Sequence, residues 1–341
     1  VLVNLGFQVS GSDISENQNV KRLKKLGLHI DIGHKSNNVK DAAILVVSSA
    51  IKSDNEELIC ARKKRLPIVK RAEMLAELMR FKKTIVVAGT HGKTTTTSLM
   101  ASVLEKAKYD PTVINGGIIN SYDSNAKLGF SNWMVVEADE SDGSFLRLPS
   151  TNVIVTNIDA EHLDFYESFK KLKDAFKNFI NNIPFYGAAI VCIDNPTIQS
   201  IISEIDDKRI ITYGLSPQAD VRAKNISFDS SKTIFTLEVS PKKDAPTKIV
   251  KNMVSTIPGI HNVQNILAVC AMSLELEIEL KVIKTALDEF EGVNRRFSLI
   301  ENYNGIKIYD DYGHHPVEIK ATLAAAREIS KDKLIAIMQP H

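Results

Sequence analysis

A glycine-rich segment at residues 89–95 combines the residue types that bind phosphate. It follows an apolar run at 84–88 and opens a helical pattern at 94–106; its residues are Gly89, Thr90, His91, Gly92, Lys93, Thr94 and Thr95. Glycines let a backbone fold closely around phosphate oxygens, and the amides and dipole of a helix N-terminus favour an anion. Lys93 supplies a charge to the β- and γ-phosphates, and the Thr94 hydroxyl can ligate Mg²⁺. The segment predicts an ATP site.

This loop is a short variant of the common phosphate loop. The longer pattern requires glycine at position 87, where this chain has Val87. A glycine turn without a ligand is the alternative interpretation. We disfavour it because the expected strand and helix flank the loop on both sides.

A carboxylate follows the next apolar strand pattern, at 133–136. The run ends in Glu137-Ala138-Asp139-Glu140, and a strand-end carboxylate beside a phosphate loop can hold Mg²⁺. Glu137 is favoured because it is the first charge after the run. The alternative is ordinary surface charge at a strand exit.

Two further polar motifs lie at the ends of predicted strands. The segment TNIDAEHLD at 156–164 contains His162, which could bind a second metal, although a lone histidine is more often structural. The segment DDYGHHP at 310–316 places two acids and two histidines before a proline-initiated helix, which also fits a turn with an N-cap. Adjacent histidines point their side chains in different directions, so they do not form an obvious metal pair.

The elements that must position these residues form α/β series. In the first 80 residues, strands at 7–13, 42–48 and 67–69 alternate with helices at 17–27 and 56–65, which predicts a parallel sheet. Ligands of such sheets bind at the carboxyl ends of strands, where Asp13, Ser48 and Ser49 fall. These residues either contact a nucleotide-like ligand or cap helices.

A second series starts near residue 82. It contains predicted strands at 84–88, 133–136, 153–156, 188–193 and 209–213, and helices at 94–106, 167–180, 261–274 and 281–290. Residues 220–257 alternate apolar and polar residues, which predicts a small antiparallel insertion.

The last part of the chain fits the start of a third domain. A linker at 292–297 precedes a hairpin with strands 297–302 and 306–310, a helix from Pro316 and a strand at 334–338. The chain begins with Val1 and ends at His341 just past this apolar run. We therefore expect a fragment of a longer protein.

Composition sets the broad class. The chain has 341 residues, 44% hydrophobic and 25% charged, with a formal net charge of +2 and three cysteines without metal spacing. Two or three globular domains fit this length. No dense basic patch indicates nucleic acid, and no apolar run is long enough to predict membrane insertion. We expect a cytoplasmic protein in a reducing compartment.

Taken together, six ordered motifs resemble the Mur ligase family, the ATP-dependent amide-forming enzymes of peptidoglycan precursor synthesis. They are GTHGKTTTT at 89–97, EADESDGSFL at 137–146, TNIDAEHLD at 156–164, GIHNVQN at 259–265, GVNRRF at 292–297 and DDYGHHP at 310–316. The resemblance covers essentially the whole chain. One departure is Asp123, where family members often carry glycine, so the sugar contacts of that loop stay open.

The resemblance implies a three-domain α/β architecture. Residues 1–80 would form an N-terminally truncated Rossmann-like domain for the UDP substrate. Residues 81–294 would form a central P-loop-type ATPase domain with a parallel sheet and a small antiparallel insertion. Residues 295–341 would start a truncated Rossmann-like domain for the amino acid.

The resemblance also implies site residues. Residues 89–95 would hold ATP, with Thr94 and Glu137 on one Mg²⁺ and His162 on a second. Asn265 would bind adenine, Arg296 or Arg295 would approach the phosphates, and Asp311 and Tyr312 would face ribose and adenine. His314 and His341 would line the amino-acid site, and the UDP end would meet Ser12, Asp13 and Ser48. The catalytic residues would be Lys93, His162 and His314.

The implied reaction joins two small molecules, UDP-N-acetylmuramate and L-alanine, in a monomer or homodimer. The lactyl carboxylate attacks the γ-phosphate of ATP, and the alanine amine then attacks the acyl phosphate. The nearest competitor is a family member that recycles a tripeptide, for which Ala at 313 and Tyr at 141 would be expected; Gly313 and Ser141 favour alanine. A P-loop ATPase or small-molecule kinase and a non-catalytic UDP-sugar-binding module are weaker competitors, because the ordered motifs and the intact Lys93 argue against them.

Overall fold

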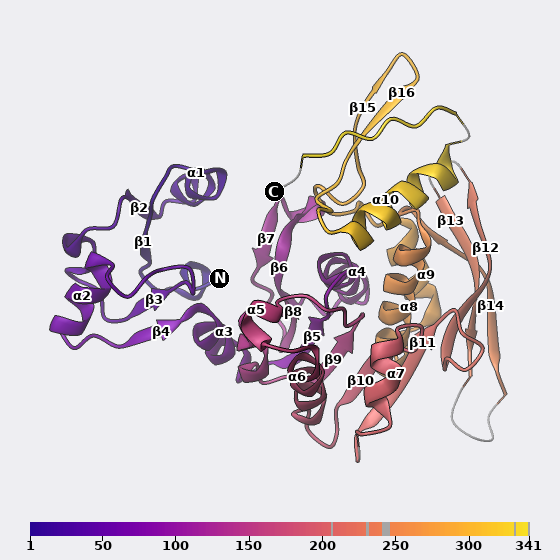
Figure 1. Cartoon of the computed structure of the whole chain (residues 1–341), viewed down its shortest axis with the longest axis horizontal. Coiled ribbons are helices and arrows are strands. Elements are labelled where there is room, and N and C mark those ends of the chain that lie inside the picture. The colour runs from indigo at the N-terminus through magenta and orange to yellow at the C-terminus, as the bar shows by residue number, and fades with distance from the viewer. Residues whose placement is uncertain (206, 230–231, 241–245, 331, 340–341) are drawn as a thin grey trace. The chain divides into compact units, whose positions relative to one another are not determined.

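The computed structural model describes residues 1–205, 207–229, 232–240, 246–330 and 332–339. The chain divides into two compact units, Val1–Arg80 and Phe81–His341, and each is described by itself (Figure 1). Among the described residues, no helix is both long and apolar enough to cross a membrane.

The first unit contains two small parallel sheets. Strand β1 (Ser10–Asp13) pairs with β2 (His29–Ile32), and β3 (Leu45–Val47) pairs with β4 (Ile68–Lys70). Its helices are α1 (Gln18–Lys25), α2 (Glu56–Lys63) and α3 (Arg71–Met79), with short 3-10 turns at Val3–Leu5 and Ser36–Val39. The parallel pairing predicted for the strands at 42–48 and 67–69 is confirmed. The strand predicted at 7–13 does not join them, because it pairs with β2, which was not predicted, in a separate sheet.

The second unit is built on one ten-stranded sheet with the order β14-β13-β12-β11-β10-β9-β5-β8-β6-β7. Its strands are β5 (Lys83–Ala88), β6 (Thr112–Ile119), β7 (Ser124–Lys127), β8 (Trp133–Glu137), β9 (Asn152–Val155), β10 (Ala188–Cys192), β11 (Arg209–Gly214), β12 (Val221–Asp229), β13 (Lys232–Val239) and β14 (Lys248–Ser255). Strand β5 is parallel to both β8 and β9. The carboxyl ends of these three strands therefore share one edge, where the predicted phosphate loop, carboxylate and histidine begin.

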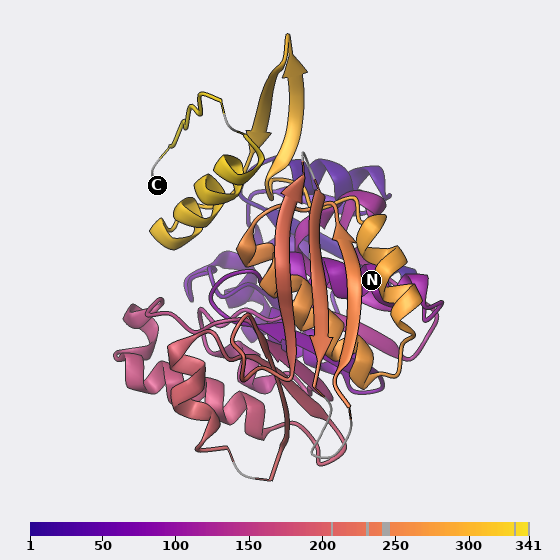
Figure 2. The same ribbon diagram turned by 90° about the vertical axis from the view of Figure 1, so that its right-hand side faces the viewer.

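The predicted antiparallel insertion continues the main sheet. Strand β12 pairs in parallel with β11 and in antiparallel fashion with β13, which pairs with β14. Asp220, just before β12, links this strand to β11, because its carboxylate accepts hydrogen bonds from the backbone amide and the hydroxyl of Thr212 at 2.8 and 2.7 Å. The three long strands stand out in Figure 2.

Two groups of helices accompany the sheet. Helices α4 (Lys93–Lys106), α8 (Ile260–Glu275) and α9 (Leu280–Asp288) pack against one another, and α4 also contacts β5, β6 and β8. Helix α6 (Phe169–Asn181) packs with α5 (Leu163–Tyr166) and α7 (Pro196–Ile202). The α4 and α6 crossovers run in opposite directions from the sheet centre. Right-handed crossovers therefore place them on opposite faces.

The chain closes with a hairpin and a helix. Strands β15 (Ser298–Tyr303) and β16 (Ile306–Asp310) are antiparallel and precede α10 (Pro316–Ile329), which contacts α8. Asn304 and Gly305 at the turn have φ of +52° and +87°, as a tight hairpin requires. The predicted strand at 334–338 is wrong. The segment has no ladder partner among the described residues, and its Ile337 side chain is 97% exposed.

Candidate active site

The phosphate loop connects β5 to α4, as predicted. Gly89 and Gly92 adopt φ of +134° and +82°. A Cβ atom at Gly89 would lie 2.1 Å from Oγ1 of Thr156, and one at Gly92 would lie 2.5 Å from Oδ1 of Asn265. Both positions therefore need glycine for conformation and for space.

The loop is braced by the residues that follow β9. The side chains of Thr156 and Asn157 donate hydrogen bonds to the carbonyl oxygen of His91 at 2.6 and 3.0 Å. Oδ1 of Asn157 accepts from the His91 amide at 2.8 Å. The start of the TNIDAEHLD motif thus fixes the shape of the loop.

Lys93 folds back over the loop. Its ammonium group donates to the carbonyl oxygens of Gly89 and Thr90 at 2.6 and 3.0 Å, and to Oε1 of Glu140 at 2.8 Å. Glu140 is 3% exposed. Burial raises the pKa of Glu140, although Lys93 acts in the opposite direction. The phosphate-binding lysine therefore has a buried acidic partner that the sequence interpretation did not include.

Thr94 and Glu137 meet, as the magnesium prediction requires. The Thr94 hydroxyl donates to Oε1 of Glu137 at 2.9 Å, and Oε2 accepts from the Gly116 amide at 2.6 Å. Arg296 reaches the same hydroxyl, with its Nη2 at 3.4 Å. Hydroxyl and carboxylate oxygens suit Mg²⁺, so this pair fits a magnesium ion shared with ATP phosphates.

His162 lies near Glu140, the acidic partner of Lys93. Its backbone has φ of +56°, and its Nε2 lies 3.8 Å from Oε1 of Glu140 and 4.0 Å from Oε2 of Glu161. Its side chain is 36% exposed. A histidine with two carboxylates nearby fits the predicted second metal position.

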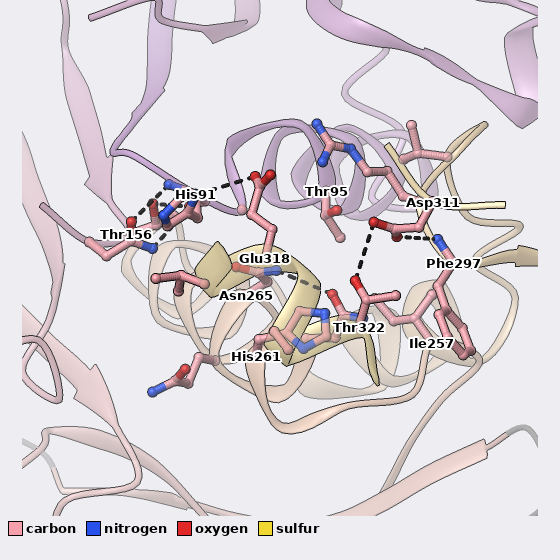
Figure 3. Close-up of a pocket in the computed structure, with 18 of the residues that line it drawn as sticks. His91, Thr95, Thr156, Ile257, His261, Asn265, Phe297, Asp311, Glu318 and Thr322 are labelled. Atoms are coloured by element: carbon pink, nitrogen blue, oxygen red, sulfur yellow. Dashed lines mark hydrogen bonds and ion pairs between the residues drawn. The ribbon is translucent and has the colours of Figure 1, made fainter. Parts of the chain in front are cut away.

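A pocket opens beside the loop, between α8, α10 and the segment after β14 (Figure 3). Asn265 lines it and donates to Oδ1 of Asn262 at 3.2 Å. His261 also lines it, and burial lowers the pKa of this histidine. The predicted adenine-binding motif therefore lies on the pocket wall.

Asp311 also faces this pocket. It accepts from the Phe297 and Gly313 amides at 2.8 and 2.7 Å and from the Thr322 hydroxyl at 3.2 Å. Tyr312 is not among the lining residues. The centre of its ring lies 5.5 Å from the Arg296 guanidinium, within the range of a cation–π contact.

His91 is the centre of an acidic cluster. Its Nε2 lies 3.4 Å from Asp159 and 3.6 Å from Glu161. Its Nδ1 lies 3.2 Å from Glu318 (Figure 3). Burial opposes a charge on His91, but the nearby carboxylates of Asp159, Glu318 and Glu161 outweigh it and raise the pKa of His91 to about 9. His315 completes the cluster, with its Nε2 3.3 Å from Oε1 of Glu161.

The remaining predicted residues have the following partners. His314 is 52% exposed, and its Nδ1 lies 3.2 Å from the carbonyl oxygen of Tyr312. In the first unit, Ser12 donates to Glu57 at 2.9 Å and contacts His34. Asp13 accepts from Ser15 and Asn17, and Ser48 accepts from the Ala50 amide. His341 lies outside the described residues.

The sequence interpretation missed four acids and one histidine of the site. They are Glu140, Asp159, Glu161, Glu318 and His315. One signal was available for Glu318, because it stands at the third position of a helix that starts at Pro316. A carboxylate there completes a capping box with the residue before the helix. No comparable spacing links Glu140 to Lys93.

The fold and the site together define an ATP-dependent enzyme of the phosphate-loop type, with a parallel sheet, a Lys-Thr loop and a facing carboxylate. Residues 87–273 match the Mur ligase middle domain, residues 1–83 the pattern described as Mur ligase family, catalytic domain, and residues 295–341 the Mur ligase glutamate ligase domain. The chain belongs to the Mur ligase family. The resemblance drawn from the six motifs is confirmed.

Within the family, the chain is similar over its whole length to individual members of one kind. The chain is 52% identical over its whole length to a UDP-N-acetylmuramate–L-alanine ligase of Rhizobium etli, and 54% identical to one of Bartonella henselae. It spans 72% of the length of each. Among solved structures, the UDP-N-acetylmuramate–alanine ligase of Thermotoga maritima has a TM-score of 0.85 and 31% identity, covering 97% of this chain and 74% of that one. A murein peptide ligase of Psychrobacter arcticus has a TM-score of 0.79 and 26% identity, covering 97% and 73%.

Proposed function

We propose that the protein joins L-alanine to the lactyl carboxylate of UDP-N-acetylmuramate and converts ATP to ADP and phosphate, for peptidoglycan synthesis in the cytoplasm. The observation that carries this proposal is the hydrogen bond between Thr94, the residue after Lys93 in the phosphate loop, and Glu137 at the end of β8, the parallel neighbour of β5. The alanine ligases that resemble the chain over its full length supply the substrates.

The residues of the site bind the phosphates of ATP and stabilise the negative charge on them. The loop amides and Lys93 hold the phosphates of ATP, and Arg296 adds a second cation beside Thr94. Thr94 and Glu137 would hold one Mg²⁺ and His162 a second; these ions would offset charge on the transferred phosphoryl group. The substrate carboxylate attacks the γ-phosphate, and the amine of alanine then displaces phosphate from the acyl phosphate. No covalent enzyme intermediate is needed.

Each of the three parts of the chain would bind a different substrate. Residues 1–80 would bind the UDP end through Ser12, Asp13 and Ser48, and residues 81–294 would bind ATP. Residues 295–341 would contribute His314 and His341 to the amino-acid site. Asn265 and Asp311 would contact adenine and ribose, because both line the pocket next to the phosphate loop.

The structure bears on the choice between alanine and a tripeptide. A Cβ atom at Gly313 would lie 2.7 Å from Oδ1 of Asp311 and 3.1 Å from Cβ of Glu318. The alanine expected there in the tripeptide-recycling enzyme would therefore require this turn to shift. The short turn at 310–315 supports the alanine ligase.

Phosphate release tests the proposal. We expect the purified protein to release phosphate from ATP only when UDP-N-acetylmuramate and L-alanine are both present. Equal release with ATP alone would reject the ligase. Release with a tripeptide but not with alanine would reassign the protein to recycling.

A further inference from the structure

A cluster that adjoins the second proposed magnesium position has the composition of a transition-metal site. His91, Glu161 and His315 each direct one ligand atom to a common point, and these atoms all lie within 4.8 Å of one another. They come from the phosphate loop, the segment after β9 and the residue before α10. The same ion would therefore contact three separate parts of the second unit.

The central atoms of this cluster lack hydrogen-bond partners. Nε2 of His91 and Oε1 of Glu161 are both buried, and neither makes a hydrogen bond. Oε1 of Glu161 lies 3.3 Å from Nε2 of His315 and 3.6 Å from Nε2 of His91. In a tetrahedral zinc site with bonds of about 2.0–2.1 Å, ligand atoms are about 3.3 Å apart. The distances from Oε1 of Glu161 to the two imidazoles match this spacing, and all three ligand atoms lie within 4.8 Å of one another.

A second carboxylate orients the first histidine. Oε1 of Glu318 lies 3.2 Å from Nδ1 of His91, the ring nitrogen that faces away from Glu161. Metal-bound histidines usually donate their other N–H to a carboxylate, which fixes the ring and strengthens the ligand. Oδ2 of Asp159, 3.4 Å from His91 Nε2, offers a further oxygen beside the group.

We infer that His91, Glu161 and His315 bind a transition-metal dication of the Zn²⁺ or Co²⁺ type. Two imidazoles and a carboxylate favour such ions over Mg²⁺, which prefers oxygen ligands. The site does not include Thr94, Glu137 or His162, and it adjoins the His162 position at Glu161, whose Oε1 faces the two histidines while its Oε2 lies 4.0 Å from His162. A bound ion would join the N-terminus of α10 to the phosphate loop.

Cobalt titration tests this inference. Untagged protein, freed of metal with a chelator and kept in excess Mg²⁺ without substrates, is titrated with Co²⁺. We expect one equivalent to give the visible absorption of four- or five-coordinate cobalt, and Zn²⁺ to remove it. We also expect one equivalent of Zn²⁺ to raise the thermal unfolding temperature. Weak binding with only the faint spectrum of octahedral cobalt would overturn the inference.

Four variants locate the ion. His315→Asn removes the imidazole but keeps a residue that caps a helix well, so α10 should still start normally. His315→Asn and Glu161→Gln should each weaken cobalt binding at least tenfold, with circular dichroism confirming that they fold. The neighbouring His314→Asn and the magnesium-position variant His162→Gln should keep wild-type binding. Loss in His162→Gln without loss in His315→Asn would place the ion elsewhere and contradict the assignment.

Discussion

At the scale of single residues, Lys93 joins the phosphate loop to the buried Glu140. In the structure its ammonium group donates hydrogen bonds to two loop carbonyl oxygens and to this carboxylate, at 2.6–3.0 Å. In the proposed function, phosphate oxygens of ATP would compete for the same donors. The position of Lys93 thus depends on a partner that is 47 positions away in the sequence, and the spacing of residues within a motif does not predict that partner.

We predict that removing this charge abolishes most of the activity. Lys93→Ala should lower kcat about 10²–10³-fold, since a preorganised cation at the transferring phosphoryl group contributes on that order. Lys93→Ala also leaves Glu140 buried without a partner, which destabilises the fold. The double variant Lys93→Ala/Glu140→Gln removes this second effect and should remain as inactive. Steady-state phosphate release measures both, with the exposed Lys171→Ala as control.

If Lys93→Ala and the double variant both keep kcat within threefold of the wild type, the proposed role of Lys93 is contradicted. Recovery in the double variant would show that the loss in Lys93→Ala came from the unpaired Glu140 instead.

The His91 cluster predicts a pH dependence of stability. His91 has its pKa raised from 6.5 to about 9, so its stabilising effect is complete below pH 6.5 and is lost as the pH rises through 9. Burial acts against the charge on Glu318, but hydrogen bonding to His91 prevails and lowers its pKa from 4.5 to about 2. Its effect is complete above pH 4.5 and is lost as the pH falls through 2. The pair stabilises most between pH 4.5 and 6.5.

Urea unfolding of the wild type and His91→Gln checks this window. The difference between their midpoints should be largest near pH 6 and should shrink through pH 9. A difference that stays constant from pH 6 to 9.5 would mean that His91 acts through packing alone.

At the scale of elements, the loop between β5 and α4 depends on two glycines in the left-handed region. We predict that Gly92→Ala costs about 1 kcal/mol for backbone conformation and more for the clash with Asn265. Because the clash lies in the nucleotide pocket, ATP affinity should fall at least tenfold. Isothermal titration with a non-hydrolysable ATP analogue measures this.

Gly305→Ala is the matched control. Gly305 has φ of +87°, close to the +82° of Gly92, and an added Cβ meets nothing within 4 Å. This variant should lose stability by about 1 kcal/mol without a change in nucleotide affinity. Equal effects on affinity in both variants would contradict the account of the loop.

Most strands of the second unit follow from their apolar runs, because a buried parallel strand needs no contact outside its own segment to be recognised. Strand β6 was missed because Gly116 and Gly117 interrupt its apolar pattern, although they let the backbone approach Glu137 and Thr94. The strand predicted at 334–338 failed for the opposite reason. Its pattern is apolar, but a strand also requires a hydrogen-bonding partner, which this segment lacks in the described residues.

At the scale of the whole chain, the sequence predicted the ATP loop, its facing carboxylate and the family, because each depends on contiguous motifs. The acidic residues around His91 and Lys93 could not be predicted from the sequence. His91 and Glu318 are 227 positions apart, and Lys93 and Glu140 are 47 positions apart. Contacts of this kind depend on how the strands are ordered in the sheet, and no periodicity within a segment encodes that order.

The fate of one oxygen atom tests the central claim most directly. UDP-N-acetylmuramate labelled with ¹⁸O in its lactyl carboxylate is turned over with ATP and L-alanine, and the released phosphate is analysed by mass spectrometry. Attack of the carboxylate on the γ-phosphate and displacement by alanine predict one ¹⁸O atom in each phosphate. Phosphate without the label would mean that water attacks ATP, and would contradict the ligase mechanism.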